Sequence, residues 1–178
     1  MPPAVTMHDL GIGQLKADVA ALKTQPITIG YQGASGEATH PNTDGVKVAQ
    51  VAAWMEFGTP GSDDRAYDVV RSMVPSRPFL RTTFLRHREA IKAKLKDAIR
   101  DLITGKATLA SAQDEIGKYV VGLVQDTIDD SRSWAEPLAP ETIERKGHDQ
   151  PLVESGTMRD AASYAVREGN RIVRQGGT

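Results

Sequence analysis

Hydrophobic and polar positions follow two different periods along this chain. Apolar side chains that recur every three or four residues, such as Leu15, Val19 and Leu22, predict amphipathic helices, whereas apolar side chains at alternate positions predict strands. The helical period covers residues 14–23, 46–57, 78–104 and 108–131, with one further turn near 141–145. The alternating period covers 27–31, 161–167 and 171–174, and the last two strands are expected to form a terminal hairpin.

The best helical pattern occupies residues 78–104. Pro78 suits the first turn of a helix, because its missing N–H is not needed there and its φ is already close to the helical value. The connection 105–107 to the next helix is short, so the two long helices are expected to lie antiparallel as a hairpin. One face of the first helix carries Leu80, Phe84, Ile91, Leu95, Ala98 and Leu102, and one face of the second carries Leu109, Ala112, Ile116, Val120, Leu123 and Thr127.

Strands and helices that do not alternate regularly favour an α+β fold. We expect a small antiparallel sheet of about three to four strands, packed against the long helical hairpin and a shorter helix. The length of 178 residues predicts a single domain over 1–178. Between the elements we expect a loose N-terminus over about residues 1–9 and extended loops at about 33–45, 58–76 and 132–155, of the kind that are generally functional or become ordered against a partner.

Charge and composition limit the functions open to this chain. The net charge is −1, with 22 lysines and arginines against 23 aspartates and glutamates, so no overall attraction to nucleic acid or acidic lipid is expected. The absence of cysteine excludes disulfides, thiolate metal sites and cysteine nucleophiles. The N-terminal residues do not resemble a signal peptide, and no apolar run approaches the about 18–20 residues that a membrane helix needs.

Motifs of the common catalytic and nucleotide-binding sites are missing. The GIG tripeptide at 11–13 does not continue into a dinucleotide-binding fingerprint, and Gly105-Lys106 lacks the other residues of a phosphate-binding loop. The histidines His8, His40, His87 and His148 are far apart and form no zinc-binding spacing. We therefore expect a protein that is not an enzyme and that binds neither a cofactor nor a metal.

Basic residues are concentrated in residues 77–100. Eight lysines and arginines stand there against two acidic residues, which gives a local charge of +6. At about 100° per residue, one stripe beside the apolar face carries Arg81, Arg88, Lys92 and Lys96. The stripe is consistent with a solvated face whose aliphatic stems cover the core, with a docking surface for an acidic protein, or with a DNA-binding face. No aromatic side chains interleave with it, as base stacking would require.

The segment Glu56-Phe57-Gly58-Thr59 is expected to end a helix. Gly58 would adopt the left-handed cap, Phe57 would cover the helix end and Thr59 would start the loop. A glutamate near a helix C-terminus is unfavourable, so Glu56 is expected to have a basic partner, either Arg77 or Arg81. Such a pair would join both ends of the 58–76 loop.

The two tryptophans lie in different surroundings. Trp54, within the predicted helix 46–57, is expected in the core. Trp134 lies in a proline-rich loop, where it either anchors that loop or docks on a neighbouring subunit.

Three segments resemble, in the same order, the motifs of a family of tailed-bacteriophage tail-completion proteins. VAAWMEFGTP (51–60) is similar to the V-A-x-x-x-E-F-G-T stretch of that family, and VPSRPFLRTTF (74–84) is similar to its I-P-x-R-P-F-L-R motif. AEPLAPETIERKGHDQPLVESGTMRDAASYAV (135–166) resembles its P-L-x-x-x-T-I-x-x-K-G…P-L-x-x-T-G-x-L-x-x-S-I-x-Y-x-V ending, with Ser155 in place of the usual Thr and Met158 in place of Leu. Together the matches span about residues 46–167.

The resemblance implies a non-enzymatic structural protein of a phage or prophage virion. Members of the family form rings that complete the tail at the head–tail junction. The implied partners are further copies of the chain, tail-tube proteins and head-connector proteins, and the implied place of assembly is the cytoplasm of the host bacterium. The residues expected to carry the interactions or the structural motif are Glu56, Phe57, Gly58, Thr59, Arg77, Pro78, Phe79, Leu80, Arg81, Arg88, Lys92, Lys96 and Trp134.

A second function stays open from the residues themselves. A small DNA-binding or regulatory module would use the basic helix within 77–100, and its binding would weaken steeply with salt.

Overall fold

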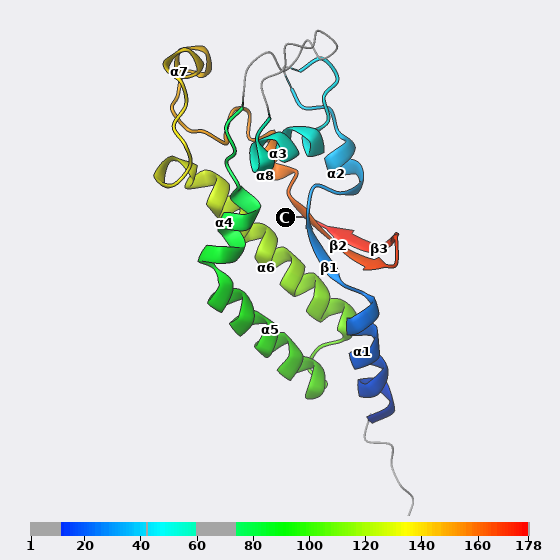
Figure 1. Ribbon diagram of the computed structural model, residues 1–178. Coiled ribbons are helices and arrows are strands. Elements are labelled where there is room, and N and C mark those ends of the chain that lie inside the picture. The colour runs from blue at the N-terminus through cyan, green and yellow to red at the C-terminus, as the bar shows by residue number, and fades with distance from the viewer. Residues whose placement is uncertain (1–11, 42, 60–73, 178) are drawn as a thin grey trace, which may run out of the picture.

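Helix α6 (Leu109–Asp129) runs through the centre of the molecule, and most other elements pack against it (Figure 1). The computed structural model describes residues 12–41, 43–59 and 74–177. A capping box between Thr108 and Ser111 satisfies the first N–H groups of α6. Of the stripe predicted from the 3.6-residue period, Ala112, Ile116, Val120 and Thr127 are buried, whereas Leu109 and Leu123 are half-buried. The core face of α6 also includes Val121, Val124 and Ile128, which the stripe did not contain.

A three-stranded antiparallel sheet lies against α6 and confirms the α+β fold. The strands are β1 (Ile27–Gly30), β2 (Ser163–Glu168) and β3 (Arg171–Gly176), in the order β1-β2-β3. The predicted terminal hairpin is β2–β3, which turns at Gly169 and Asn170. Strand β1 pairs with β2 in the register Ile27↔Val166, so a strand from the N-terminal part of the chain fixes the position of the C-terminal hairpin.

The sheet approaches α6 closely at one glycine. The Tyr164 side chain on β2 packs over Gly117, so that a Cβ atom there would lie 2.3 Å from the tyrosine ring. A second glycine of α6, Gly122, has nothing within 4 Å of the same position. Gly117 therefore allows the close packing of helix and sheet, whereas Gly122 has no such role.

The segment predicted as one helix over 78–104 is divided in two. Helix α4 (Phe79–Arg86) and helix α5 (Arg88–Ile103) meet at His87, whose φ of −105° and ψ of 15° interrupt the helical geometry. The buried Thr83 hydroxyl donates to the carbonyl oxygen of Phe79 at 2.8 Å, and such back-bonding bends helices. Both parts still pack against α6, and α5 forms the predicted antiparallel hairpin with it through the connection 105–107.

The break changes which side chains of this segment are buried. A single straight helix predicted Phe84 and Leu95 on the core face, but Phe84 is 45% exposed and Leu95 is 37% exposed. Phe79 and Thr83 are fully buried instead. The prediction for Phe84 was wrong because it carried one helical phase across His87, whereas Leu95 lies at the edge of the face on which α5 buries Ala98 and Leu102.

Two further helices lie at opposite ends of the molecule in Figure 1, one at the lower right and one in the upper part. Helix α1 (Ile12–Thr24) confirms the N-terminal helix and extends away from the body. Helix α3 (Val48–Phe57) confirms the helix predicted over 46–57 and buries Val48 and Ala52. Trp54 on α3 is only half-buried and does not belong to the buried core, contrary to the prediction, because the core side of α3 is formed by smaller side chains.

The segments predicted as loops contain short helices. Helix α2 (Gly33–Glu37) occupies the start of the 33–45 loop. Its Gly36 packs directly on the backbone of Tyr31, where a Cβ atom would lie 2.6 Å from the carbonyl oxygen. The 132–155 loop is framed by a 3₁₀ turn (Ser131–Ser133) and α8 (Thr157–Asp160) and contains α7 (Pro140–Lys146), the helix predicted near 141–145. The expected loose N-terminus at 1–9, and residues 60–73 of the 58–76 loop, lie outside the described residues.

No helix in the described ranges is long and apolar enough to span a bilayer.

Candidate interaction site

The carboxylate of Glu56 forms the centre of a junction between α3 and α4. Its Oε2 accepts a hydrogen bond from the backbone N–H of Leu80 at 2.8 Å, and its Oε1 accepts from the N–H of Arg81 at 3.3 Å. The Arg81 guanidinium Nε donates to the same Oε1 at 3.1 Å. Glu56 is buried, and it serves as the N-terminal cap of α4, a position in which a negative charge is favourable.

The expected basic partner of Glu56 is therefore Arg81. Arg81 also donates from its Nη2 to the carbonyl oxygen of Glu56 at 3.0 Å, so it binds both the side chain and the C-terminal end of α3. Arg77, the other candidate, does not pair with Glu56. The pairing with Arg81 removes this arginine from the basic stripe that a straight helix predicted.

Arg77 instead binds the segment that follows α6. It is buried, its Nε donates to the carbonyl oxygen of Glu136 at 2.9 Å, and its Nη2 donates to that of Pro137 at 3.3 Å. Burial lowers the pKa of Arg77, while the charge of Glu136 acts in the opposite direction. Its own backbone N–H donates to the carbonyl oxygen of Met55 at 2.6 Å, so Arg77 connects α3 with the segment at 136–137.

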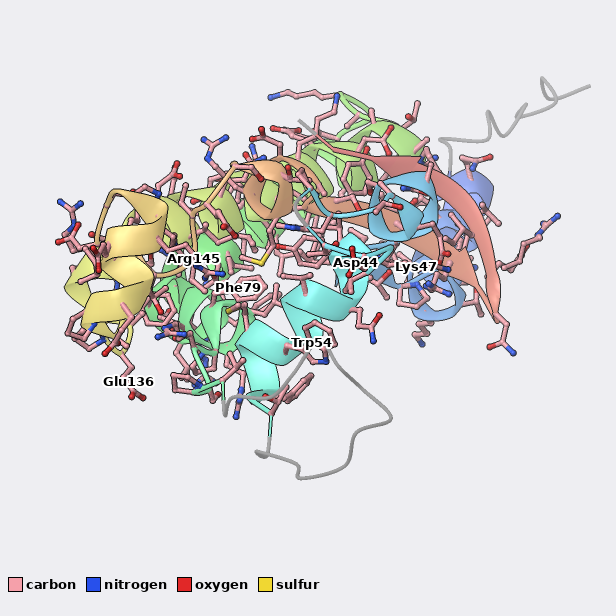
Figure 2. The ribbon with its side chains drawn as sticks, turned by 90° about the horizontal axis from the view of Figure 1, so that it is seen from above. Asp44, Lys47, Trp54, Phe79, Glu136 and Arg145 are labelled. Carbon is pink, nitrogen blue, oxygen red and sulfur yellow. The ribbon has the colours of Figure 1, made fainter. Side chains whose placement is uncertain are left out.

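Arg77 and Pro78 therefore do more than begin helix α4. Pro78 directly precedes α4, and its carbonyl oxygen accepts from the N–H of Thr82 at 2.9 Å. Phe79 is fully buried and packs edge-on against Tyr31, with 6.1 Å between ring centroids. Leu80 is half-buried against the same core. Figure 2 shows Phe79 in the interior, while the side chain of Glu136 points away from the body.

The end of α3 differs from the predicted cap. Gly58 has a positive φ of 74°, but its ψ of 172° is extended rather than left-handed helical. A Cβ atom at Gly58 would lie 3.0 Å from the carbonyl oxygen of Val74, so the glycine permits the two ends of the 58–76 loop to approach. Thr59 pairs with Val74 in an isolated antiparallel bridge. Phe57 does not cover the helix end: it is 72% exposed and lies beneath the Arg81 guanidinium, 5.8 Å from its ring centroid.

Trp134 anchors its own loop to α6. The indole N–H donates to the carbonyl oxygen of Thr127 at 3.0 Å, and the half-buried ring packs against the core. Arg86 lies over the ring at 5.8 Å from its centroid. Of the two interpretations of Trp134 that the sequence leaves open, these contacts favour the intramolecular anchor.

A pocket of about 660 Å³ separates the 136–154 segment from the body. Apolar side chains of Met55, Leu152 and Met158 line it together with Arg77 and Lys146. Burial lowers the pKa of Lys146, and the nearby charges of Arg77 and Arg145 act in the same direction, against that of Glu154. The acidic residues of the lining are exposed, so the more enclosed charged side chains of this pocket are Arg77 and Lys146.

The remaining members of the basic stripe, Arg88, Lys92 and Lys96, are exposed on α5. Lys92 pairs with Glu89 one helical turn away, whereas Arg88 and Lys96 have no ion pair among the described residues. The sequence prediction missed that Leu95, Ile99 and Ile103 are exposed on the same side of α5. Their four-residue spacing is visible in the sequence, but the prediction assigned Leu95 to the core face and did not consider Ile99 and Ile103.

Comparisons with protein-family models, with curated proteins and with solved structures return no match to this chain. Within the described ranges, no group of three or more histidines and carboxylates is placed to hold a metal ion. The hydrogen bonds and the ion pair of this junction hold α3, α4 and the segment at 136–137 together.

Proposed function

We propose that this chain is a ring-forming structural protein of a phage or prophage virion, which completes the tail at the head–tail junction. The observation that carries the proposal is the meeting of three distant segments at one junction. Glu56 belongs to the first segment that resembles the tail-completion family, Arg81 belongs to the second, and the carbonyl oxygens of Glu136 and Pro137 belong to the third. The residues that resemble the family are therefore in contact with one another.

This convergence gives the resemblance a physical reason. The side chains of the first two segments depend on each other, because Glu56 caps α4 and pairs with Arg81, and Arg77 joins them to the backbone of the third segment. Three weak motifs that meet at one junction support a common fold better than three matches that lie far apart would.

The surface also suits a subunit of a ring. Ring subunits contact their neighbours through two different surfaces, a heterologous contact that closes by rotation. Exposed apolar side chains lie on α1 and α5, at different parts of the molecule (Figure 1). As a subunit of this kind the protein would act through self-association and through docking to tail-tube and connector proteins, without turnover of a substrate.

Sedimentation velocity of the purified chain tests the proposal. We expect the 19.2-kDa monomer to convert with rising concentration into one closed species whose mass is a whole-number multiple of the monomer. A chain that stays monomeric up to about 1 mM, a concentration that detects even weak association, would contradict ring formation in isolation.

The exposed Arg88, Lys92 and Lys96 favour a second candidate, a small DNA-binding or regulatory module. This alternative predicts binding to duplex DNA that weakens steeply with salt. A fluorescence anisotropy titration at two salt concentrations distinguishes the two candidates, because a ring subunit without a DNA-binding role would show no binding even at about 50 mM salt.

A further inference from the structure

The outer face of α5 is an unpartnered helix surface. We define it by the exposed residues Arg88, Lys92, Leu95, Lys96, Ile99 and Ile103, which lie within about 100° of arc at the helical period. The neighbouring side of α5 buries Ala98 and Leu102 toward α6, so the helix already has a core face next to this surface. A helix that carries a second apolar stripe, bordered by basic side chains, presents a surface that suits an acidic partner with some apolar area.

An acidic counterpart exists on the same chain. We define the α7 lobe as residues 136–154, in which five acidic and two basic residues give a charge of −3 with histidine neutral. No residue of α7 is buried, and the 660 Å³ pocket lies between α7 and the body, to which the two ends of the lobe are held by Arg77 and by the buried Leu152. In Figure 1, α7 lies at the upper end of the molecule and α5 extends toward the lower end, and Figure 2 shows the lobe at one edge.

The charges of the two surfaces are largely unused within one copy. In the described part of the chain, ion pairs are absent from the exposed carboxylates of Glu136, Glu141, Glu144 and Glu154. Arg88 and Lys96 on α5 likewise lack an ion pair there. The lobe also offers one half-buried apolar side chain, Leu138, two residues after Glu136.

We propose that the α7 lobe of one copy docks on the outer face of α5 of a second copy. In this contact Glu141 and Glu144 face Lys92 and Lys96. The two surfaces differ, so the contact is heterologous and repeats from copy to copy, as a ring requires. The inference rests on the proposed function in that it names the surfaces through which the ring subunits associate.

The size of the contact sets its expected strength. A short helix on one helix face buries less than the about 800 Å² per partner of a standard interface. The isolated contact is therefore weak, and closure of a ring or attachment to a tail supplies the additional stability. Because its charged pairs stay near solvent, the association also weakens as salt is raised.

Charge reversal provides the test. Variant one carries Lys92→Glu and Lys96→Glu, and variant two carries Glu141→Lys and Glu144→Lys. Each variant alone places like charges opposite each other, so its self-association constant is expected to fall more than about tenfold in sedimentation velocity. An equimolar mixture restores opposite charges at every contact and is expected to recover association.

Matched controls carry the same changes of charge elsewhere. Lys106→Glu with Lys118→Glu, and Asp44→Lys with Asp126→Lys, change exposed residues outside both surfaces that have no ion pair in the described chain. These controls are expected to associate as the wild type does. Circular dichroism of every variant checks that the fold is kept.

A second readout identifies the contact directly. A carbodiimide, which joins an amine to a carboxylate without a spacer, is applied to a mixture of isotope-labelled and unlabelled wild-type protein. Mixed-isotope cross-links from Lys92 or Lys96 to Glu141 or Glu144 are expected by mass spectrometry.

The outcomes separate the inference from the proposed function. Self-association that neither charge-reversed variant weakens, or that mixing does not restore, overturns the α7–α5 contact while ring formation stands. A wild-type chain that does not self-associate overturns the contact, and the role in the virion is then decided by its binding to tails. DNA binding that is lost in variant one and unchanged or strengthened in variant two assigns the outer face to nucleic acid and also overturns the contact.

Discussion

Replacing Glu56 by alanine removes the cap of α4 and its connection to α3 in one step. The backbone N–H groups of Leu80 and Arg81 lose their carboxylate acceptor, and the loss of an N-terminal cap costs about 0.5–2 kcal/mol. Hydrogen bonds to a charged group contribute about 1.5–3 kcal/mol. We therefore expect the loss of the buried cap to lie in the upper part of the range of about 0.5–2 kcal/mol. Because the Arg81 side chain is 60% exposed, it regains water, and its ion pair adds at most about 1 kcal/mol.

Together these contributions give an expected destabilisation of about 2–4 kcal/mol for Glu56→Ala. Urea unfolding followed by circular dichroism measures it as a lower midpoint with an unchanged slope. Glu56→Gln keeps the side-chain volume and one acceptor oxygen, so it is expected to cost about half as much. Arg81→Ala removes only the exposed partner and is expected to cost no more than about 1 kcal/mol.

The relative losses of unfolding free energy in these three variants test whether Glu56 caps α4. If Glu56→Ala and Arg81→Ala cost the same, the carboxylate acts only as an ion-pair partner and does not cap the helix. A double variant completes the cycle, and its coupling energy should stay below about 1 kcal/mol for so exposed an arginine.

Three further predictions concern packing and pH. Gly117→Ala should destabilise the fold by about 1–3 kcal/mol, because the added methyl group overlaps the Tyr164 ring. Gly122→Ala, on an open part of the same helix, should stabilise it by about 0.5–1 kcal/mol. Thermal unfolding that ranks the two variants in the opposite order would contradict this packing. Leu95→Ala should cost only about 1 kcal/mol in urea unfolding, because the side chain is 37% exposed, and a cost above about 2 kcal/mol would place it in the core. Burial is the main cause that raises the pKa of Tyr31, and the charge of Glu56 is the second. The contribution of the neutral phenol to stability is therefore complete below the ordinary tyrosine pKa of about 10 and declines as the pH rises further. Tyr31→Phe should flatten this alkaline decline of the unfolding free energy, and an identical decline in both proteins would refute the prediction.

Local periodicity was sufficient to predict most helices and the terminal hairpin. The stripe of α6 alternates buried and exposed positions over 21 residues, which leaves little choice of face. The fold class followed from the order of these elements. The pairing of β1 with β2 did not, because Ile27 and Val166 meet only through the packing of everything between them.

The errors arose where tertiary contacts change a local pattern. One threonine back-bond and the packing of both halves on α6 divide α4 from α5, and this moved Phe84 out of the predicted core face. Gly36 looked like a turn residue but is a point of close approach to the Tyr31 backbone.

The contacts of the candidate site could be predicted only in part. An unfavourable charge at the end of α3 correctly indicated a partner for Glu56, and Arg81 is that partner. The acceptors of Arg77 could not be predicted, because they are backbone carbonyls that leave no signal in the sequence.

The central claim is that copies of this chain form a ring at the end of a phage tail. Electron microscopy of the purified protein added to isolated tail tubes tests it most directly. The account predicts a ring of copies, coaxial with the tube and confined to one end. Tubes whose ends stay bare while the protein remains monomeric, or protein found only on added duplex DNA, would contradict it.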